Sequence, residues 1–378
     1  MAKIEVVPVT DAAGLKAFIA LPKRLYQGQK GYVAPLDMER EEVLSPKKNP
    51  YFTHAKAQLF IARRDGTTVG RISAQVCSLE QKLRPGTGHF GWLDAEDDPA
   101  IYRALIDTVA DWLRKEGSTR IVGPLSFCTN EETGLLVDGF DSLPMLMMPY
   151  HAPYAGKNVE AAGLAKLKDL VAYDLDKSAY KPMGSSRMLE KMQVDGTIRM
   201  RGLDMKNYTR DLGIILDIFN DAWSENWGMI PFTADEIAAA AKSMKPLIDP
   251  DLVVIAEVKG EPAGMLVCLP NLMEAIRDFN GSLLPFNVFK LLWRLKRKTL
   301  KSSRIPLMGI RKQHHGSVLG ATLLPLMFNR LKEPFLKRGL ESVEMSWILE
   351  DNLPMRRVIE GVGGKVYKTY RIYEKSLA

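Results

Sequence analysis

The chain has 378 residues, of which 46% are hydrophobic and 26% are charged, a composition typical of a folded globular protein. Its three cysteines, Cys77, Cys128 and Cys268, lie far apart, which argues against a disulfide framework or a cysteine metal site. No run reaches the ~18 apolar residues of a membrane span, and the first residues lack the apolar region of a signal peptide. The sequence therefore predicts a cytoplasmic protein without a bound metal.

Positive charge is concentrated in one region of the chain. The net charge is +7, yet residues 279–332 contain eleven Lys or Arg and no Asp or Glu, so the remainder is net negative. A basic region in an otherwise acidic chain indicates an anionic partner, such as nucleic acid, a phosphorylated cofactor or anionic lipid. Nucleic acid is the poorest fit, because the region is rich in apolar residues and lacks a recognition motif.

Three sequence patterns follow one another along the first part of the chain. Residues 59–75 contain two apolar runs separated by a turn with glycine, which predicts a β-hairpin. Residues 112–127 contain a helix end, a glycine stop and a strand. Residues 159–176 repeat that order of helix, glycine and strand.

The same three patterns return in the second part of the chain, at 253–269, 335–349 and 358–375. In the hairpins, Ile61, Ala62, Gly66 and Gly70 match Ile255, Ala256, Gly260 and Gly264. In the last pattern, Glu160, Gly163, Lys168 and Tyr173 match Glu360, Gly363, Lys368 and Tyr373. Three matches in one order predict two copies of an α/β unit, at 1–178 and 196–378, with a linker at 179–195.

Each predicted copy runs helix, hairpin, strand, helix, strand, helix, strand. This order predicts a mixed central sheet with helices on its faces. The separation between matching residues rises from 194 in the hairpins to more than 220 in the second pattern, so the second copy contains an insertion at about 271–303. The insertion lies within the basic region.

Residues 285–301 of the insertion predict an amphipathic helix with a period of 100° per residue. One face carries the apolar set Val288, Leu291, Leu292, Leu295 and Thr299, flanked by Phe286, Phe289, Trp293 and Leu300. The opposite face carries Lys290, Arg294, Arg297, Lys298 and Lys301. Such a helix is typical of the interface of an anionic membrane. The alternative is a packed helix whose basic face meets solvent or a phosphorylated cofactor.

Residues 308–324, MGIRKQHHGSVLGATLL, predict a strand end, a basic turn with glycine and the start of an apolar helix. That order forms an anion site, because free amides at a helix N-terminus attract negative charge. Val318 stands where a second glycine would allow close approach of a phosphate. The segment is therefore either a cofactor loop altered at one position or a structural turn without a ligand.

The second copy resembles the GCN5-related N-acetyltransferase (GNAT) superfamily. RIPLMGI followed by RKQHHGSVLGA is similar to its acyl-CoA pyrophosphate loop, with His315, Gly316, Ser317, Val318, Leu319 and Gly320 in the frame of the motif. VEMSWIL followed by EDNLPMRRVIEGVGG is similar to its strand, asparagine-headed helix and final glycines. The first copy has the same layout, but its equivalent region, GHFGWLDAEDDPAIYRAL, is acidic and lacks the loop.

Nearly end to end, the chain also resembles a family of doubled bacterial acyltransferase-like proteins, that of bacterial ceramide synthase. The landmarks are FIALPKRLY, GPLSFCTNEETGLLVDGF, MMPYHAPY, FNDAWSENWG and SWILEDNLPMRR. The resemblance implies an α/β fold of two tandem GNAT-like lobes, the first of them degenerate. It also implies transfer of a long-chain acyl group from acyl-CoA to the amine of a sphingoid base, at the cytoplasmic face of the inner membrane.

The resemblance and the residue types together suggest which residues contact the ligands. The expected acyl-CoA contacts are Gly309, Ile310, Arg311, Lys312, His315, Gly316, Ser317 and Gly320, with strand 304–310 aligning the pantetheine. The candidate contacts of a lipid-like amine are Asn130, Glu132, Trp223, Trp227, Phe289, Trp293 and Trp347.

Amide formation requires a base for the ammonium and stabilisation of an oxyanion. Glu344 is the best carboxylate candidate for the base, and a structural salt bridge is its alternative. Strand alternation predicts Glu344 and Ser346 on one face and Trp347 on the other. Tyr150 and His151, in a proline-rich turn, are further catalytic candidates. Asn352 is either a site residue or only a helix N-cap.

Many GNAT enzymes carry a tyrosine acid seven residues after the asparagine of this helix, but counting from Asn352 gives Ile359. Another residue then supplies the acid, or the leaving thiolate needs none, or the protein does not catalyse. Two other functions therefore stay open: a soluble N-acetyltransferase for a small amine or peptide, and a non-catalytic acyl-CoA- or lipid-binding protein.

Overall fold

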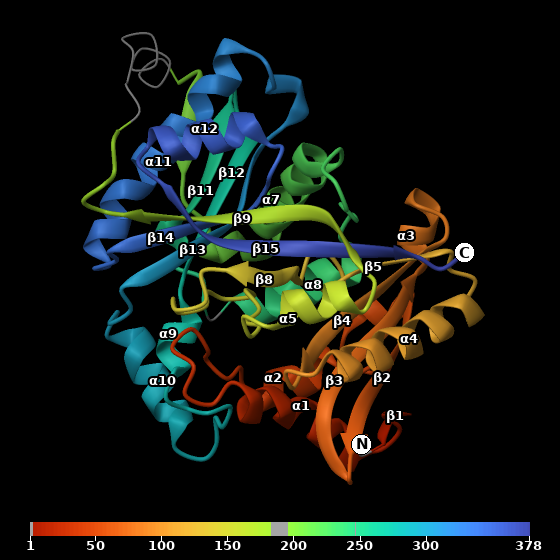
Figure 1. The fold of residues 1–378 in the computed structure, drawn as a ribbon. Helices are drawn as coiled ribbons and strands as arrows, with labels where there is room; N and C mark the ends of the chain where they lie inside the picture. Colours follow the sequence, from red (N-terminus) through yellow and green to blue (C-terminus); the bar gives the residue numbers. More distant parts are fainter. Residues whose placement is uncertain (1–2, 183–195, 246) are drawn as a thin grey trace. The chain divides into compact units, whose positions relative to one another are not determined.

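The computed structural model describes residues 3–182, 196–245 and 247–378 (Figure 1). By internal contacts the chain divides into two compact units. Unit 1 comprises Met1–Val171, Ile276–Leu291 and Tyr367–Ala378, and unit 2 comprises Ala172–Ala275 and Leu292–Val366. The predicted linker, 179–195, lies largely outside the described residues, so the proposed boundaries at 178 and 196 stay a prediction.

The first part of the chain contains nine strands and five α-helices among its described residues. They are β1 (Ile4–Pro8), α1 (Ala12–Leu25), α2 (Asp37–Val43), β2 (Ala55–Arg64), β3 (Thr67–Cys77), α3 (Ser78–Leu83), β4 (Thr87–Ala95), α4 (Pro99–Lys115), β5 (Arg120–Gly123), β6 (Leu125–Ser126), β7 (Glu132–Thr133), β8 (Leu135–Asp138), α5 (Ala155–Ala161) and β9 (Ala165–Asp176). Within unit 1 the sheet has the order β1-β2-β3-β4-β5-β15, and only β4 and β5 pair in parallel.

The second part repeats the layout. It contains β10 (Ile198–Arg201), α7 (Tyr208–Trp223), α8 (Ala234–Met244), β11 (Val253–Val258), β12 (Glu261–Pro270), α9 (Leu272–Ile276), α10 (Asn287–Lys296), β13 (Ser302–Ile310), α11 (Val318–Lys337), β14 (Ser342–Leu349), α12 (Leu353–Gly361) and β15 (Lys365–Ser376). Within unit 2 the sheet has the order β14-β13-β12-β11-β10, and β13 and β14 are parallel. α7 and α11 pack against β12 and β13 (Figure 1).

The two predicted hairpins are confirmed, and they share one register. Ala62 pairs with Gly70 in the first hairpin, and Ala256 pairs with Gly264 in the second. A β-bulge follows directly after each of these alanines. Both turns also place two consecutive residues at positive φ, which glycine supplies at the second position of the turn. Identical pairing of matched residues supports duplication of one unit.

The last strand of each copy belongs in part to the other unit. Residues 172–176 of β9 lie in unit 2, where the Tyr173 hydroxyl donates to Glu360 Oε1 at 2.7 Å. Residues 367–376 of β15 lie in unit 1, where the Tyr373 hydroxyl donates to Glu160 Oε1 at 3.3 Å. The matched Tyr–Glu pairs of the sequence are therefore exchanged between the two copies.

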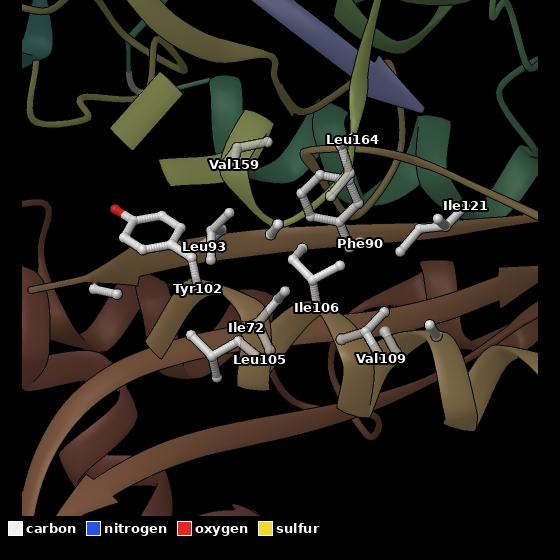
Figure 2. Packing of buried hydrophobic residues seen from close by; sticks show 14 of the residues in the cluster. Ile72, Phe90, Leu93, Tyr102, Leu105, Ile106, Val109, Ile121, Val159 and Leu164 are labelled. Carbon is white, nitrogen blue, oxygen red and sulfur yellow. The ribbon is translucent and has the colours of Figure 1, made fainter. Parts of the chain in front are cut away.

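The core of unit 1 forms between α4 and the sheet (Figure 2). Pro99 starts the helix behind an Asp98 cap, and apolar residues at helical spacing point to one side. The buried residues of α4 are Ile101, Tyr102, Leu105, Ile106, Val109, Ala110 and Leu113. Gly70 of β3 allows this approach, because an added Cβ would lie 2.9 Å from carbons of Ile101 and Leu105.

The insertion occupies the residues between β12 and β13. Its predicted helix, 285–301, is shorter in the structure, where α10 ends at Lys296 and Lys298 has a φ of 53°. A left-handed residue cannot continue an α-helix, so the predicted helix was too long at its C-terminal end. None of the residues described in α10 is buried. In the described part of the chain, no helix is long and apolar enough to cross a bilayer.

Candidate functional site: a divided sheet and a basic loop in unit 2

Two parallel strands of unit 2 separate part-way along their length. β13 and β14 pair from Ser302–Ser342 to Ile305–Met345, and no pairing follows, although β13 runs to Ile310 and β14 to Leu349. β12 continues beside β13 as far as Ile310, so the outer half of β13 has a paired edge and an open edge. An open strand edge is a template for an extended ligand with amide groups.

The hydrogen-bonding pattern identifies the groups on the open edge. The N–H of Arg311 donates to Ala263 O at 2.8 Å, so by alternation Gly309 and Leu307 also bond to β12. Met308 and Ile310 therefore direct their N–H and C=O groups away from β12.

The two carbonyl groups on this edge are already used. Trp223 Nε1, at the end of α7, donates to Met308 O at 3.2 Å. His315 Nε2 lies 2.7 Å from Ile310 O, and this nitrogen carries the proton because a carbonyl only accepts. The open edge thus presents the N–H groups of Met308 and Ile310 as donors. Trp223 and His315 were both predicted as site residues, but their contacts with this edge were not.

The predicted loop follows β13 directly and ends in a capped helix. After a short 3-10 turn at Lys312–His314, Gly316 has a φ of 67°, and the Ser317 hydroxyl accepts the N–H of Gly320 at 3.0 Å. The first N–H groups of α11 have no partner within the helix, so this end attracts anions. Val318, which stands where the motif usually has a second glycine, is 68% exposed and so does not pack into the body of unit 2.

Gly320 is the glycine that the loop geometry requires. A Cβ at this position would lie 2.0 Å from the carbonyl oxygen of His314, which is far inside van der Waals contact. The 3-10 turn therefore packs directly on the first turn of α11. This contact fixes the direction of the free amides relative to the end of β13.

The basic side chains of the loop are paired with carboxylates of α7 and the turn after it. Arg311 contacts Asp217 at 2.5 Å, and Lys312 Nζ contacts Glu225 at 2.6 Å. The Lys312 N–H donates to Asp221 at 2.9 Å. Asp217, Asp221 and Glu225 recur every four residues, a signal that the sequence analysis missed. Both side-chain ion pairs involve exposed carboxylates, so a phosphate can compete for the cations at small cost.

Glu344 lies in a buried ion pair. It is fully buried on β14, 3.3 Å from Arg304 Nε, and accepts the Ser346 hydroxyl at 2.5 Å. The Ser346 contact confirms that these two residues share a face. The Arg304 guanidinium also lies 4.8 Å from the centre of the Trp347 ring, so strict alternation ends at Ser346. The geometry matches the salt-bridge alternative, and a role for Glu344 as base stays a prediction.

Asn352 caps α12, and its side chain accepts the N–H of Met355 at 3.3 Å. Ile359, seven residues after Asn352, is completely buried on that helix. Trp227 lies half-buried in the turn after α7. These positions give Asn352 a structural role at least, and they leave the general acid unassigned.

The remaining candidates lie in unit 1 or on α10. His151 is buried, and its Nδ1 accepts the N–H of Leu136 at 3.1 Å. Burial lowers the pKa of His151, so the ring is neutral at pH 7 with its proton on Nε2. Tyr150 packs in a group with Tyr26 and Tyr32. Glu132 and Asn130 lie in and beside β7, where Glu132 pairs with Arg40 at 2.5 Å.

On α10, Phe289 is 70% exposed and Trp293 is 56% exposed. Leu284, Phe286 and Leu292 are also exposed, so large apolar side chains gather along 284–293. We call this segment the apolar finger. Lys290 and Arg294 are turned back to contact Asp278 and the carbonyl of Ala275.

Two solved structures of GNAT proteins align along almost the whole chain. A tandem GNAT protein from the clavulanic acid biosynthesis pathway has a TM-score of 0.58 at 14% identity, covering 100% of this chain and 99% of that one. A GNAT protein from Sphaerobacter thermophilus has a TM-score of 0.54 at 12% identity, covering 99% and 96%. The fold is thus that of the tandem GNAT proteins, an α/β fold with a mixed sheet flanked by helices, as predicted.

Comparison of the amino-acid sequence with known proteins identifies the family within this fold. Bacterial ceramide synthase of Caulobacter vibrioides is 47% identical over 378 residues, covering 100% of this chain and 98% of the relative. Protein YghO of Escherichia coli K12 is 40% identical over 366 residues, covering 96% and 93%. No family model matches the chain. The chain belongs to the family of bacterial ceramide synthase, and it is an N-acyltransferase.

Proposed function

We propose that the protein transfers a long-chain acyl group from acyl-CoA to the amine of a sphingoid base, at the cytoplasmic surface of the membrane. The observation that carries acyl-CoA use is the open edge of β13 leading directly into the free amides of α11. Acyl-CoA is long and thin, and the amide groups of its pantetheine arm lie between the thioester and the pyrophosphate, which suits this order of donors. The name of the Caulobacter relative supports a ceramide-forming reaction.

In this proposal, groups of unit 2 bind acyl-CoA and stabilise the oxyanion of the reaction. The amides of the first turn of α11, with Arg311 and Lys312, hold the pyrophosphate. The N–H groups of Met308 and Ile310 bond to pantetheine carbonyls and to the oxyanion formed at the thioester carbon. The amine nitrogen forms the new C–N bond, the C–S bond breaks, and the sulfur leaves as the thiolate of CoA. The ammonium must lose its protons to a base, for which Glu344 stays the candidate.

The apolar finger supports a membrane location. Five large apolar side chains along 284–293 are more than half exposed, and cations of α10 and the following turn lie beside them. Exposed apolar area of this kind, next to positive charge, favours an anionic lipid surface over water. A substrate that resides in a bilayer accounts for such a finger, whereas a small soluble amine does not.

The first test measures binding and turnover with purified protein. We expect micromolar binding of palmitoyl-CoA by calorimetry, weaker binding of acetyl-CoA, and CoA release in mixed micelles only when sphinganine is present. A preference for acetyl-CoA and a soluble amine would replace this proposal with a soluble N-acetyltransferase. Absence of binding to either thioester would sink the acyl-CoA assignment altogether.

The apolar finger gives a separate prediction. Replacing Phe286, Phe289 and Trp293 together with serine should lower partitioning onto vesicles with anionic lipid about 1,000-fold or more, because each inserted aromatic contributes about 1.5–3 kcal/mol and about 1.4 kcal/mol corresponds to a factor of ten. Sedimentation with vesicles measures this loss. The control replaces the exposed Leu336 of α11 with serine, which should leave partitioning unchanged. Equal partitioning of the triple variant and the wild type would contradict a role of the finger in membrane binding.

A non-catalytic acyl-CoA-binding protein is the second candidate. It is favoured by the buried Ile359 at the usual place of the acid and by the ion pair that occupies Glu344. It predicts tight binding of palmitoyl-CoA without CoA release in the presence of any amine. The micelle assay above distinguishes the two candidates in one experiment.

A further inference from the structure

Unit 1 contains a counterpart of the divided sheet, but its opening is closed. β4 and β5 pair from Thr87–Arg120 to His89–Val122, and β4 then runs on to Ala95. A Cβ on Gly91 would lie 1.8 Å from the carbonyl oxygen of Leu125, so the chain after β5 packs directly on β4. A pantetheine arm cannot enter here. Trp92 follows at once and has a φ of 49°, an unusual backbone conformation for a bulky residue.

Charged side chains surround Trp92. The guanidiniums of Arg40 and Arg71 lie 5.2 and 5.5 Å from the centre of its ring. Arg71 pairs with Asp94 at 2.7 Å, and both residues are buried. Arg40 pairs with Glu132 at 2.5 Å. Each cation thus has its own carboxylate, so the cluster has little net charge to attract an ion.

The carboxylates of this cluster all have hydrogen-bond or ion-pair partners, but two of its hydrogen-bond donors have none. Asp94 also accepts the hydroxyl of Tyr26 at 2.5 Å. In contrast, Trp92 Nε1 and Tyr32 Oη are buried and have no hydrogen-bond partner among the described residues. Trp92 as a whole is only 4% exposed. Burying a donor without a partner lowers the stability of the fold by about 1–3 kcal/mol. An acceptor that bonds to these two atoms would therefore be bound favourably.

The neighbours of these donors place them in one cluster. Arg40, Arg71 and Asp94 act electrostatically on Tyr32, whose pKa is raised by burial, so its hydroxyl stays protonated at neutral pH. Asp94, Glu132 and Arg71 likewise act on His151. The Nε2 of His151 carries its proton, since Nδ1 accepts a backbone N–H. The cluster therefore offers three N–H or O–H donors and no unused carboxylate.

The chain just before the apolar finger contacts α2, the helix that carries Arg40 of this cluster. Within unit 1, the N–H of Asp37 donates to Gly281 O at 2.9 Å, and Asp37 pairs with Lys23 at 2.8 Å. Gly281 has a φ of 83°, and a Cβ there would lie 2.9 Å from the Asp37 carboxylate. α2 therefore contacts the chain at Gly281, three residues before the apolar finger, and carries Arg40 one turn after Asp37.

We propose that unit 1 binds the oxygen-bearing head of the lipid-like amine, with Trp92 Nε1, Tyr32 Oη and His151 Nε2 donating to its hydroxyl or carbonyl oxygens. The proposal rests on the proposed function, because it takes the acceptor to be an amphipathic amine. A neutral, oxygen-rich head fits a cluster whose charges are already paired, whereas a phosphate does not. The aliphatic chain of this ligand would be supplied from the surface that carries the finger.

The test compares two amines of equal chain length. Sphinganine carries two hydroxyl groups beside its amine, and octadecylamine carries none. With palmitoyl-CoA, the wild type should show a kcat/KM for sphinganine at least 100-fold above that for octadecylamine, since a site built to bond hydroxyls rejects analogues that lack them. Trp92→Phe and Tyr32→Phe should each reduce this ratio about tenfold, through the sphinganine KM.

The matched control is Trp112→Phe, the same change on the half-buried face of α4, which should leave the ratio unchanged. Calorimetry with an eight-carbon 2-amino-1,3-diol, without any thioester, measures the site independently of turnover. Binding to the wild type that Trp92→Phe weakens supports the site, even where no amine is acylated and the proposed function fails. Equal use of both amines, with no binding of the short diol, means that buried water satisfies these donors, and it overturns the site while the acyltransfer proposal stands.

Discussion

Gly320→Ala should raise the Kd for palmitoyl-CoA at least tenfold, with little loss of the fold. The added Cβ would lie 2.0 Å from the carbonyl oxygen of His314, so the 3-10 turn at Lys312–His314 must move outward. Such a shift separates the basic side chains from the free amides of α11, and a displacement of about 1 Å can cost up to about 100-fold in a positioned site. Calorimetry with palmitoyl-CoA measures the change.

The matched control is Gly213→Ala, in the interior of α7. A Cβ at Gly213 meets no atom within 4 Å, so this variant should gain about 0.5–1 kcal/mol of stability and keep its affinity. The proposed cofactor loop would be excluded if Gly320→Ala bound palmitoyl-CoA as tightly as Gly213→Ala. Circular dichroism of both variants checks that the helices remain.

Glu344→Gln and Arg304→Met should each destabilise unit 2 by about 3–5 kcal/mol, because each change removes one charge of a buried ion pair. Arg304 and Glu344 are at most 2% exposed, so water cannot replace the lost contact. The melting temperature of the protein should fall by roughly 10 °C in each single variant. Differential scanning fluorimetry measures it.

The double variant Arg304→Met with Glu344→Met removes both charges and should recover most of this stability. It also separates the two interpretations of Glu344. A folded double variant without CoA release supports a catalytic base at this position. A folded double variant that keeps its turnover identifies Glu344 as a structural residue, and the base must then be sought elsewhere.

The repeated fold could be predicted from the sequence because its signals are local. Gly66 and Gly260 lie in turns at positive φ, and Gly163 and Gly363 lie at helix ends. The boundaries of these elements can therefore be predicted from residues next to them in the sequence. The amphipathic character of 285–296 was equally local. The helix end at Lys296 was missed because no glycine or proline marks it, and Lys298 adopts its left-handed conformation in the folded chain.

Much of the candidate site depends on contacts between distant residues, and these were not predicted. Arg304 lies 40 residues from Glu344 in the sequence, and only the parallel register of β13 and β14 brings them together. The carboxylates that hold Arg311 and Lys312 come from α7 and the turn after it, and the spacing of four between them was overlooked. The cluster at Trp92 has no motif, because its partners come from α2, β3 and β7.

The exchanged strands set a limit on how this protein can be shortened. An isolated second copy, 196–378, would lack residues 172–176 of its own unit and would expose residues 367–376 without their partner strands. Such a fragment carries an open sheet edge and is prone to aggregate. Each copy thus supplies strand residues to the unit of the other copy. A chain cut back to its second copy would therefore lose part of its own unit even though it kept every residue of the candidate loop and of β13.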